Sequence, residues 1–286
     1  MARIKAVMSV SSNIAESVQD PVRPAPSAPE DGTGESLRRT YDRYFKVILA
    51  ESDKHLDWSY RLRYQVYCLE NQYESASDNA NERETDEYDR QSEHALLIHR
   101  ETGTVVGTTR LIMPKVNGKD LFQPIHQICP PDILAELSDR IPVSKTAEIS
   151  RFAIAKEFRR RAEDKGTITG GLTNMGSDNP RRLIPHISLG LIQSIVAMAQ
   201  KRGMTHIYAV MEPALLRMLR GLGIHWEKLG PVVDYHGRRQ PCFCDLDQLL
   251  ATTWDEHPEV WEVMTDEGRI WPLNPEKTSN GAISRV

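Results

Sequence analysis

The chain has 286 residues, 40% of them hydrophobic, which suffices for one domain with a sizeable core. Its formal net charge of -4 argues against a nucleic-acid footprint over the whole surface, and no apolar run approaches the roughly 20 residues that span a membrane. The four cysteines show no disulfide framework, and no apolar core follows the first basic residues as in a secretory signal, so a reducing cytoplasm is the expected setting.

The two ends of the chain are predicted to lie outside the main domain. Residues 1–38 are expected to form a disordered tail, because residues 17–32 are rich in proline and small side chains and have nothing to bury. Residues 251–286 are expected to form a helical C-terminal extension. The predicted domain therefore covers residues 39–250.

The domain is predicted to begin with a strand at 44–50, a helix and a long polar loop. Apolar residues recur at helical spacing up to about Leu69, and Asp57 is expected to cap that helix. Residues 70–92 are polar and contain the acidic sequence Asp-Glu-Tyr-Asp at 86–89. A loop of this length in a compact domain is usually functional or mobile, although solvated charge is the commoner reason for an acidic run.

A hairpin is predicted next, with strands at 94–99 and 105–113. Arg110 lies well inside the second strand. A buried arginine requires carboxylate partners. The candidate partners are Asp86, Asp89 and Glu148.

The sequence Glu-Ile-Ser-Arg-Phe-Ala-Ile at 148–154 is predicted to be the central strand. Alternation places Glu148 and Ser150 on one face and Arg151 on the other. Charged groups among core-type residues need partners or water. An edge strand that carries a surface ion pair would have the same composition.

A strand–helix–strand unit is predicted to follow from the central strand. Residues 159–180 are rich in glycine, serine, threonine and asparagine and are expected to be a flexible insertion. A helix from about 181 to 202 leads to a strand at 205–211, which a right-handed connection places parallel to the central strand. A short helix at 214–219 and strands near 225–229, 232–235 and 241–245 complete the series.

No metal site is predicted. The nine histidines are scattered, and the chain has no His-x-x-x-His or Cys-x-x-Cys pair. Cys242 and Cys244 point to one face of the last predicted strand, where core packing explains them better than a pair of ligands.

Together these elements predict an α+β fold with a mixed, mostly antiparallel sheet. Their order resembles the GNAT acyltransferase fold, and the polar motifs resemble those of the acyl-homoserine-lactone (autoinducer) synthases and the N-acyl amino acid synthases. The matching motifs are Arg63 and Tyr67 on the first helix, Asp-x-x-Asp at Asp86 and Asp89, Gly-x-x-Arg-Leu at 107–111 and Glu-x-Ser-Arg-Phe at 148–152. Tyr67 stands where the family more often has phenylalanine.

The resemblance implies a sheet that opens between the strands at 148–154 and 205–211, with the donor thioester in the opening. A bulge near residues 152–155 would expose backbone N–H groups to the thioester oxygen. Glu148 is the expected base or positioning group for the amine, and the two strand arginines are expected to hold the acidic loop and Glu148 through bidentate pairs. The implied catalytic residues are Glu148, Arg110, Arg151, Asp86 and Asp89, and the implied substrate-binding residues are Arg63, Tyr67, Ser150, Phe152, Ala153 and Ile154.

The expected donor is a fatty acyl group on the phosphopantetheine of acyl carrier protein, with acyl-CoA as the alternative and no permanently bound cofactor. The GNAT pyrophosphate motif Arg/Gln-x-x-Gly-x-Gly/Ala is missing after Ile154, which argues against ordinary coenzyme A. Carrier proteins are acidic, so a basic set is expected to steer them, although solvated loop charge is nearly as good an explanation. The set is Arg159, Arg160, Arg161, Lys165, Arg181 and Arg182.

The insertion, the tail and the extension look closest to the acyltransferases associated with the PEP-CTERM/exosortase system. The predicted reaction transfers a fatty acyl group to the amine of an amino acid or a related small molecule. The alternatives are an acetyl-CoA-dependent GNAT acetyltransferase and a non-catalytic GNAT-fold module that binds lipid or a partner protein. A nucleic-acid partner is not expected, because few aromatic residues interleave the basic ones.

Overall fold

A computed structural model describes residues 36–79, 81–115, 122–158 and 183–278. The predictions for the tail up to residue 35, for the insertion at 159–180 and for all six basic residues of the carrier-binding set lie outside the described residues. No helix in the described part of the chain is long and apolar enough to cross a membrane.

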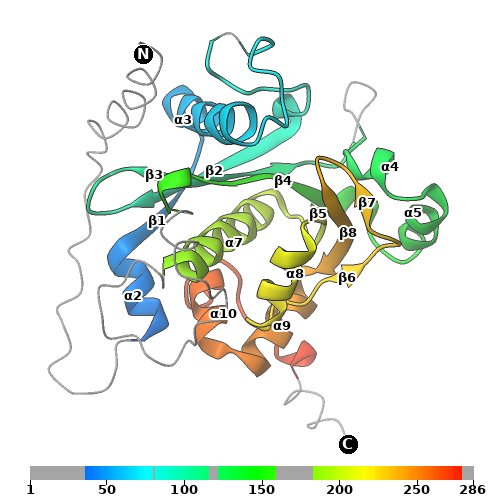
Figure 1. The fold of residues 1–286 in the computed structure, drawn as a ribbon. Helices are drawn as coiled ribbons and strands as arrows, with labels where there is room; N and C mark the ends of the chain where they lie inside the picture. The colour runs from blue at the N-terminus through cyan, green and yellow to red at the C-terminus, as the bar shows by residue number, and fades with distance from the viewer. Residues whose placement is uncertain (1–35, 80, 116–121, 159–182, 279–286) are drawn as a thin grey trace, which may run out of the picture.

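One mixed sheet organises the described residues, with the strand order β1-β2-β3-β4-β5-β8-β6 and β7 paired to β8 (Figure 1). The β4–β5 pair is parallel and the other pairs are antiparallel, which confirms the predicted α+β class. The strands are β1 Phe45–Leu49, β2 Ser92–His99, β3 Val105–Ile112, β4 Thr146–Ile154, β5 His206–Met211, β6 Glu227–Lys228, β7 Val233–Asp234 and β8 Arg238–Asp245.

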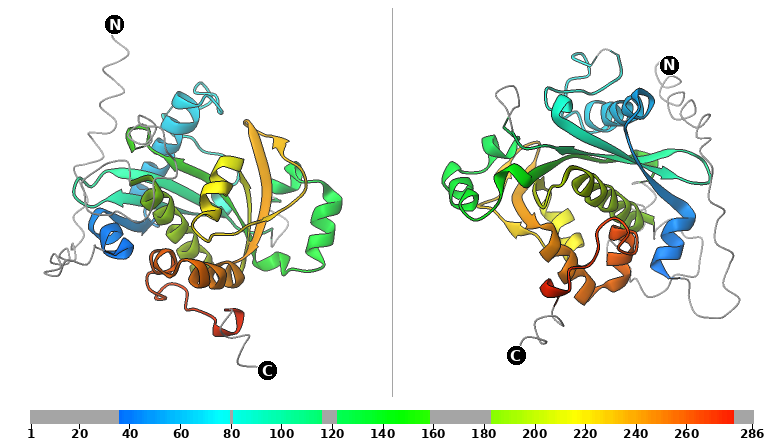
Figure 2. Two further views of the ribbon diagram at one scale, coloured as in Figure 1. Left: turned by 60° about the horizontal axis from the view of Figure 1, so that its bottom comes forward. Right: turned by 180° about the vertical axis from the view of Figure 1, so that it is seen from behind.

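Helices cover both faces of the sheet (Figures 1 and 2). Helix α3, Asp53–Arg63, lies on one face, and α7, Leu183–Arg202, lies on the other. The remaining α-helices of the described residues are α2 Leu37–Tyr44, α4 Ile125–Ile128, α5 Pro131–Ser138, α8 Pro213–Arg220, α9 Leu246–Glu256 and α10 Pro258–Thr265.

The main core lies between the sheet and α7. The predicted apolar stripe of this helix is buried at Ile187, Leu191 and Ile195, against strand residues such as Leu97 and Leu111. Burial of one such side chain contributes about 1.5–3 kcal/mol. This apolar layer packs against the α7 side of β3 and β4. The opposite side of these two strands, which faces α3, carries polar residues.

The sheet opens between β4 and β5. Their ladder runs from the pair Thr146 and His206 to the pair Ile149 and Ala209 and stops there, although β4 continues to Ile154. The opening lies between the two strands for which it was predicted.

A bulge in the β3–β4 pair lies at Arg151 and Phe152, at the start of the range for which it was predicted. Arg110 pairs with Ser150 and Thr108 pairs with Ala153, so two residues of β4 oppose Thr109. Arg151 has a φ of 51°, in the left-handed region that few long side chains adopt. The bulged residues, Arg151 and Phe152, thus reach the N-terminal edge of the predicted range 152–155. The simple alternation that put Arg151 on the face opposite Ser150 is wrong, because the bulge adds a residue there.

The start of the fold also differs from the prediction. Residues Leu37–Tyr44 form α2, capped by Ser36, so order begins before Tyr41 and the first strand starts at Phe45. Helix α3 begins after Ser52 instead of Asp57. It continues as a π-helix at Tyr64–Glu70, which apolar spacing alone does not predict.

The C-terminal segment is part of the main core. Helix α9 starts at Leu246, so the predicted boundary at residue 250 falls inside it. Val260, Val263 and Met264 of α10 are completely buried in the cluster that contains the α7 stripe. The segment is thus two helices that complete one core, where a single appended helix and a tail were predicted.

Candidate active site

Three buried arginines meet the acidic loop on the α3 side of the sheet. Arg63 ends α3, Arg110 lies in β3 and Arg151 lies at the β4 bulge, and their side chains are 0%, 1% and 13% exposed. Their partners are carboxylates of the single loop segment 74–89. These ion pairs thus connect α3, β3 and β4 to one loop segment that contains little regular secondary structure.

Arg63 lies at the centre of this network. Its Nε donates to Glu84 Oε2 at 2.5 Å, and its terminal nitrogens donate to both oxygens of Asp89 at 2.7 and 3.2 Å. A bidentate pair of this kind fixes orientation as well as charge. Arg63 was expected to bind substrate, but each of its three guanidinium nitrogens donates to a carboxylate of the loop.

Arg110 connects the loop to β4. One terminal nitrogen donates to Asp86 at 2.5 Å and to Asp89 at 2.7 Å, and Nε donates to Ser150 Oγ at 2.8 Å. The Asp86 N–H donates to Asp89 Oδ2 at 2.8 Å, so the Asp-x-x-Asp motif closes on itself. The predicted partnership of Arg110 with the two aspartates is present in the structure.

Arg151 reaches the same loop from the bulge. Its guanidinium donates to Glu84 at 2.8 Å and to Glu74 and Asp86 at 3.1 Å each. The Tyr67 ring lies 5.1 Å from this guanidinium, within the range of a cation–π contact. The expected ion pairs of Arg110 and Arg151 with Glu148 are not formed, because both guanidiniums are taken up by loop carboxylates.

Glu84 was not predicted from the sequence, yet it is the most buried carboxylate of the loop at 2% exposure. It lies between Arg63 and Arg151. Burial by itself would raise the pKa of Glu84, but the two arginines outweigh it and hold the pKa below its usual value. Asp89 is affected in the same way by Arg63 and Arg110, which hold its pKa well below the ordinary range.

Glu148 has a different environment. It is 2% exposed, and its Oε2 accepts one hydrogen bond of 3.0 Å from the Ile125 N–H at the start of α4. Burial raises the pKa of Glu148 to about 8, and the Ile125 N–H and the Arg110 charge offset only part of this effect. Glu148 is therefore the carboxyl of the site that exchanges a proton near neutral pH.

Tyrosines surround Glu148 from several elements. Tyr208 is its neighbour across the β4–β5 ladder. After burial, the Glu148 charge is among the causes that raise the pKa of Tyr208, Tyr88 and Tyr235. The Tyr88 hydroxyl accepts a 3.3 Å hydrogen bond from Gln127 of α4. These phenols were not predicted as site residues, since aromatic positions in strands and loops usually indicate packing.

The remaining predicted site residues lie at the end of β4. Ala153 is buried, whereas Phe152 and Ile154 are half-buried and pack against the main core. All three follow the last β4–β5 pair, Ile149 with Ala209. They are therefore beside the opening of the sheet, where the donor was expected.

Among the described residues, no group of three or more histidine, cysteine or acidic side chains could hold a metal ion. Cys242 and Cys244 are buried, and the Cys242 thiol donates to the Ala209 carbonyl at 3.2 Å. These cysteines are part of the core.

Residues 62–168 match the family model described as an acetyltransferase (GNAT) domain. This match confirms the predicted GNAT fold and the prediction of an acyltransferase enzyme. No curated protein matches the sequence.

Several solved structures are similar in fold. TofI in a ternary complex with an inhibitor and MTA has 22% identity and a TM-score of 0.48, over 73% of this chain and 96% of that chain. The CoA-dependent acyl-homoserine lactone synthase BjaI, with SAM and isopentyl-CoA, has 19% identity and a TM-score of 0.45, over 79% of this chain and 89% of that chain. FeeM, an N-acyl amino acid synthase from uncultured soil microbes, has 13% identity and a TM-score of 0.46, over 73% of this chain and 94% of that chain.

Proposed function

We propose that this GNAT-domain protein transfers a fatty acyl group from a thioester on acyl carrier protein, or on coenzyme A, to the amine of an amino acid or a related small molecule. The observation that carries the proposal is Glu148, a buried carboxyl with a pKa of about 8 beside the opening of the sheet. A carboxyl that titrates near neutral pH is suited to accept the proton of an attacking amine.

In the proposed reaction the amine nitrogen attacks the thioester carbonyl carbon directly. Glu148 accepts one proton of the amine, the C–N bond forms and the C–S bond breaks. The leaving thiolate then takes this proton from Glu148, which returns to its carboxylate form. Backbone N–H groups of β4 beyond Ile149 are the proposed donors to the carbonyl oxygen as it gains charge. Arg110, Arg151, Asp86 and Asp89 are proposed to fix the loop over the acceptor.

The finer assignments are also proposals. The acidic carrier protein would be steered by Arg159, Arg160, Arg161, Arg181 and Arg182. A cytoplasmic setting is supported by four buried free cysteines. The relationship to PEP-CTERM/exosortase-associated acyltransferases is supported by the sequence resemblance alone.

The test incubates the purified full chain with pooled amino acids and one donor at a time, and identifies products by mass spectrometry. The donors are a long-chain acyl carrier protein, the same acyl group on coenzyme A, and acetyl-CoA. A long-chain N-acyl amino acid is the expected product. A product with acetyl-CoA alone would identify an acetyltransferase instead, and tight lipid binding without any product would identify a binding module.

The choice of donor has its own test. Replacing Arg159, Arg160 and Arg161 together by alanine is expected to lower kcat/KM for the acyl carrier protein at least tenfold and to leave kcat/KM for acyl-CoA unchanged. An equal loss with both donors would contradict a carrier-docking role.

A further inference from the structure

Gln123 lies just before α4 and is only 2% exposed, so its side-chain amide needs partners inside the protein. Its Nε2 donates to the Ile112 carbonyl at 3.2 Å and to the Thr146 carbonyl at 2.9 Å, which uses both amide protons. Ile112 is the last residue of β3, and Thr146 is the first residue of β4. One side chain thus joins the turn before α4 to the ends of two neighbouring strands.

Both carbonyls belong to the immediate surroundings of Glu148. Ile112 is the partner of Glu148 in the β3–β4 ladder, and Thr146 lies two residues before Glu148 on the same strand. The Ile125 N–H, two residues beyond Gln123, donates to Glu148 Oε2 at 3.0 Å. The contacts therefore run from the strands that frame Glu148, through the Gln123 amide, and back to the Glu148 carboxyl.

The turn that carries the Ile125 N–H is attached to the sheet in two ways. The Ile125 side chain is completely buried in an apolar cluster that contains Tyr208, but apolar contact is non-directional. The hydrogen bonds of the Gln123 amide are directional, so they fix where the turn points its N–H groups. Because N–H···O bonds lengthen out of range beyond about 3.2 Å, a displacement of a few tenths of an ångström would weaken the bond from Ile125 to Glu148.

We propose that Gln123 is a positioning residue, whose amide holds the Ile125 N–H on Glu148 and thereby controls how readily this carboxyl gives up its proton. The catalytic meaning of this assignment rests on the proposed function, in which Glu148 is the base. A hydrogen bond to the carboxylate favours its ionised form. Loss of the Ile125 N–H should therefore raise the pKa of Glu148, in the same direction as burial.

The other titratable and charged groups around Glu148 come from several elements. They are Arg110 of β3, Tyr208 of β5, Cys242 of β8, Tyr88 of the acidic loop, Tyr235 directly after β7 and, against Tyr208, His126 of α4. Burial raises the pKa of the three phenols and the thiol and lowers the pKa of His126, so all five groups are uncharged near pH 8.

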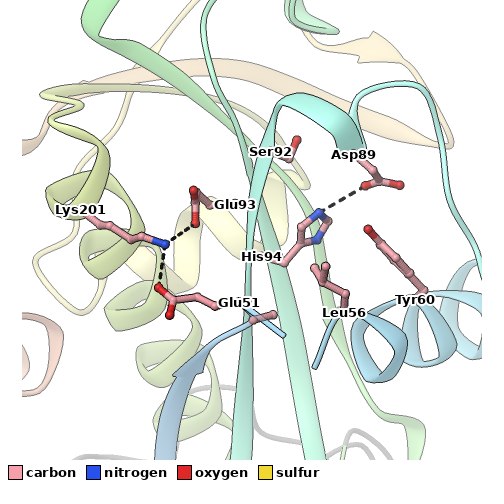
Figure 3. A pocket seen from close by; sticks show the side chains of 9 residues that line it. Glu51, Leu56, Tyr60, Asp89, Ser92, Glu93, His94 and Lys201 are labelled. Carbon is pink, nitrogen blue, oxygen red and sulfur yellow. Dashed lines mark hydrogen bonds and ion pairs between the residues drawn. The ribbon is translucent and has the colours of Figure 1, made fainter. Parts of the chain in front are cut away.

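The network behind Arg110 also keeps its charge in this range. Arg110 pairs with Asp89, and Figure 3 shows His94 turned toward Asp89 from the other side. Burial lowers the pKa of His94 to about 3, so its ring stays neutral while Glu148 titrates. A titration centred near pH 8 can thus be followed at Glu148 itself.

The test follows the Glu148 carboxyl directly by ¹³C NMR of the full chain, labelled at the glutamate carboxyls and titrated from pH 6 to 10. The Glu148 signal is the one that Glu148→Gln lacks. Gln123→Met keeps a side chain of similar length without the amide and is expected to raise the midpoint by about one pH unit, a tenfold change in the acid dissociation constant. The Ile125 amide proton should shift with the carboxyl in the unchanged chain and lose this response in Gln123→Met. An unchanged midpoint in a folded Gln123→Met protein would overturn the proposal.

Gln193→Met is the matched control. Gln193 is a buried glutamine of α7 whose Oε1 accepts from the Tyr41 hydroxyl of α2 at 2.7 Å. This variant is expected to lose stability without moving the Glu148 midpoint, and equal shifts in both variants would mean general loosening and would contradict the assignment. If Gln123→Met does not fold, the side-chain amide protons of Gln123 in the unchanged chain decide. They should shift with the Glu148 midpoint, and protons that do not respond would rule out the coupling.

Acyl transfer gives a separate measurement that depends on the proposed function. A rise of one unit in the pKa of Glu148 lowers its ionised fraction at pH 7 about tenfold, so kcat/KM of Gln123→Met should fall about tenfold at pH 7 and approach that of the unchanged enzyme at pH 10. An equal loss at both pH values would contradict the role of Gln123 in proton affinity. A chain that transfers no acyl group would contradict the proposed function, whereas the NMR titration needs no substrate and tests the positioning role alone.

Discussion

Glu84 and Glu148 are both 2% exposed, but their surroundings give them opposite ionisation. Glu84 accepts from two guanidiniums and stays charged, whereas Glu148 accepts from one backbone N–H and holds its proton up to a pH of about 8. Because both carboxyls are equally buried, their hydrogen-bond partners determine their ionisation. Two guanidiniums keep Glu84 ionised, whereas a single backbone N–H leaves Glu148 able to exchange a proton.

Replacing Glu148 by Gln is expected to stabilise the protein at high pH. The folded carboxyl retains a proton between pH 4.5, its unfolded value, and about 8, so the stability of the unchanged chain falls as pH rises through this window. A shift of this size corresponds to roughly 5 kcal/mol as an upper figure. Urea unfolding measures the free energy of unfolding of both proteins at pH 5 and pH 9. Glu148→Gln should be about as stable as the unchanged chain at pH 5 and more stable than it by a few kcal/mol at pH 9.

The same variant is expected to lose acyl transfer by about 10²–10⁴-fold, because the amine has no proton acceptor. For the unchanged enzyme, kcat/KM should rise with pH through about 8 as Glu148 becomes ionised. Turnover by a folded Glu148→Gln protein at the original rate would remove the role assigned to this carboxyl.

Replacing Glu84 by Gln is expected to have the opposite effect on stability. The pKa of Glu84 is lowered in the folded state, so its contribution is present above its unfolded value of 4.5 and is lost as pH falls below it. Breaking a buried pair leaves Arg63 and Arg151 short of a partner, at a cost of about 3–5 kcal/mol at pH 7. Chemical unfolding of Glu84→Gln beside Glu82→Gln, a largely exposed control on the same loop, measures the difference. Equal stability of the two variants at pH 7 would contradict a structural role of Glu84.

Motifs in the sequence predicted Arg110, Asp86 and Asp89 as partners because a charged residue inside a strand requires a counter-charge. Glu84 could not be selected in this way, since Glu82 and Glu87 in the same polar loop have the same local character. Which loop carboxylate is buried depends on where Arg63 and Arg151 meet in space, and neither local propensity nor spacing contains this information.

At the scale of elements, two departures from regular geometry aim side chains at the loop. The bulge at Arg151 turns its guanidinium to the face of Arg110 and Ser150. The π-helix at Tyr64–Glu70 carries Tyr67, whose ring lies against that guanidinium and whose carbonyl accepts the N–H groups of Tyr73 and Glu74. Apolar periodicity predicted the hairpin, the β4–α7–β5 unit and the buried stripe of α7. It does not predict the bulge in β4 or the π-helix, because neither an added strand residue nor a widened helical turn has a distinctive apolar pattern.

Gly107 is expected to be sensitive because it lies close to the bulge on the neighbouring strand. A Cβ atom there would be 2.8 Å from the Ala153 carbonyl oxygen and 3.1 Å from Leu191 of α7. Gly107→Ala should therefore push β3 and β4 apart and cost about 1–3 kcal/mol. Gly221→Ala is the control, because its Cβ would meet nothing closer than 3.4 Å. Thermal unfolding compares the two, and a Gly107→Ala melting temperature equal to that of the control would mean that the contact relaxes without cost.

At the scale of the whole molecule, the C-terminal helices close the layer beneath α7. Helix α10 packs on both α7 and α2, and Arg38 of α2 pairs with Asp266 at the end of α10. The two ends of the described chain are therefore joined across one core. The sequence predicted that both ends lie outside the main domain. It could not predict their packing, because the sequence of a short amphipathic helix does not show which surface the helix will cover.

Truncating Met264 tests this arrangement. Met264 is completely buried, and Met264→Ala is expected to cost about 2–5 kcal/mol by lost burial and the cavity left behind. Glu262→Ala on the same helix, where the side chain is only partly buried, should change stability by less than about 0.5 kcal/mol. If both variants unfold at the same urea concentration as the unchanged chain, α10 is not part of the cooperative unit.

In the loop at 71–91, Glu84 is the one buried side chain among the described residues. The segment has almost no apolar anchorage, so its attachment depends on charge and not on the hydrophobic effect. Acid that protonates Glu84 and Asp89 should therefore release the loop while the sheet stays folded. Amide hydrogen exchange would then show the loop exchanging rapidly at a pH where β3 and α7 remain protected, so the loop would detach before the sheet and its helices unfold.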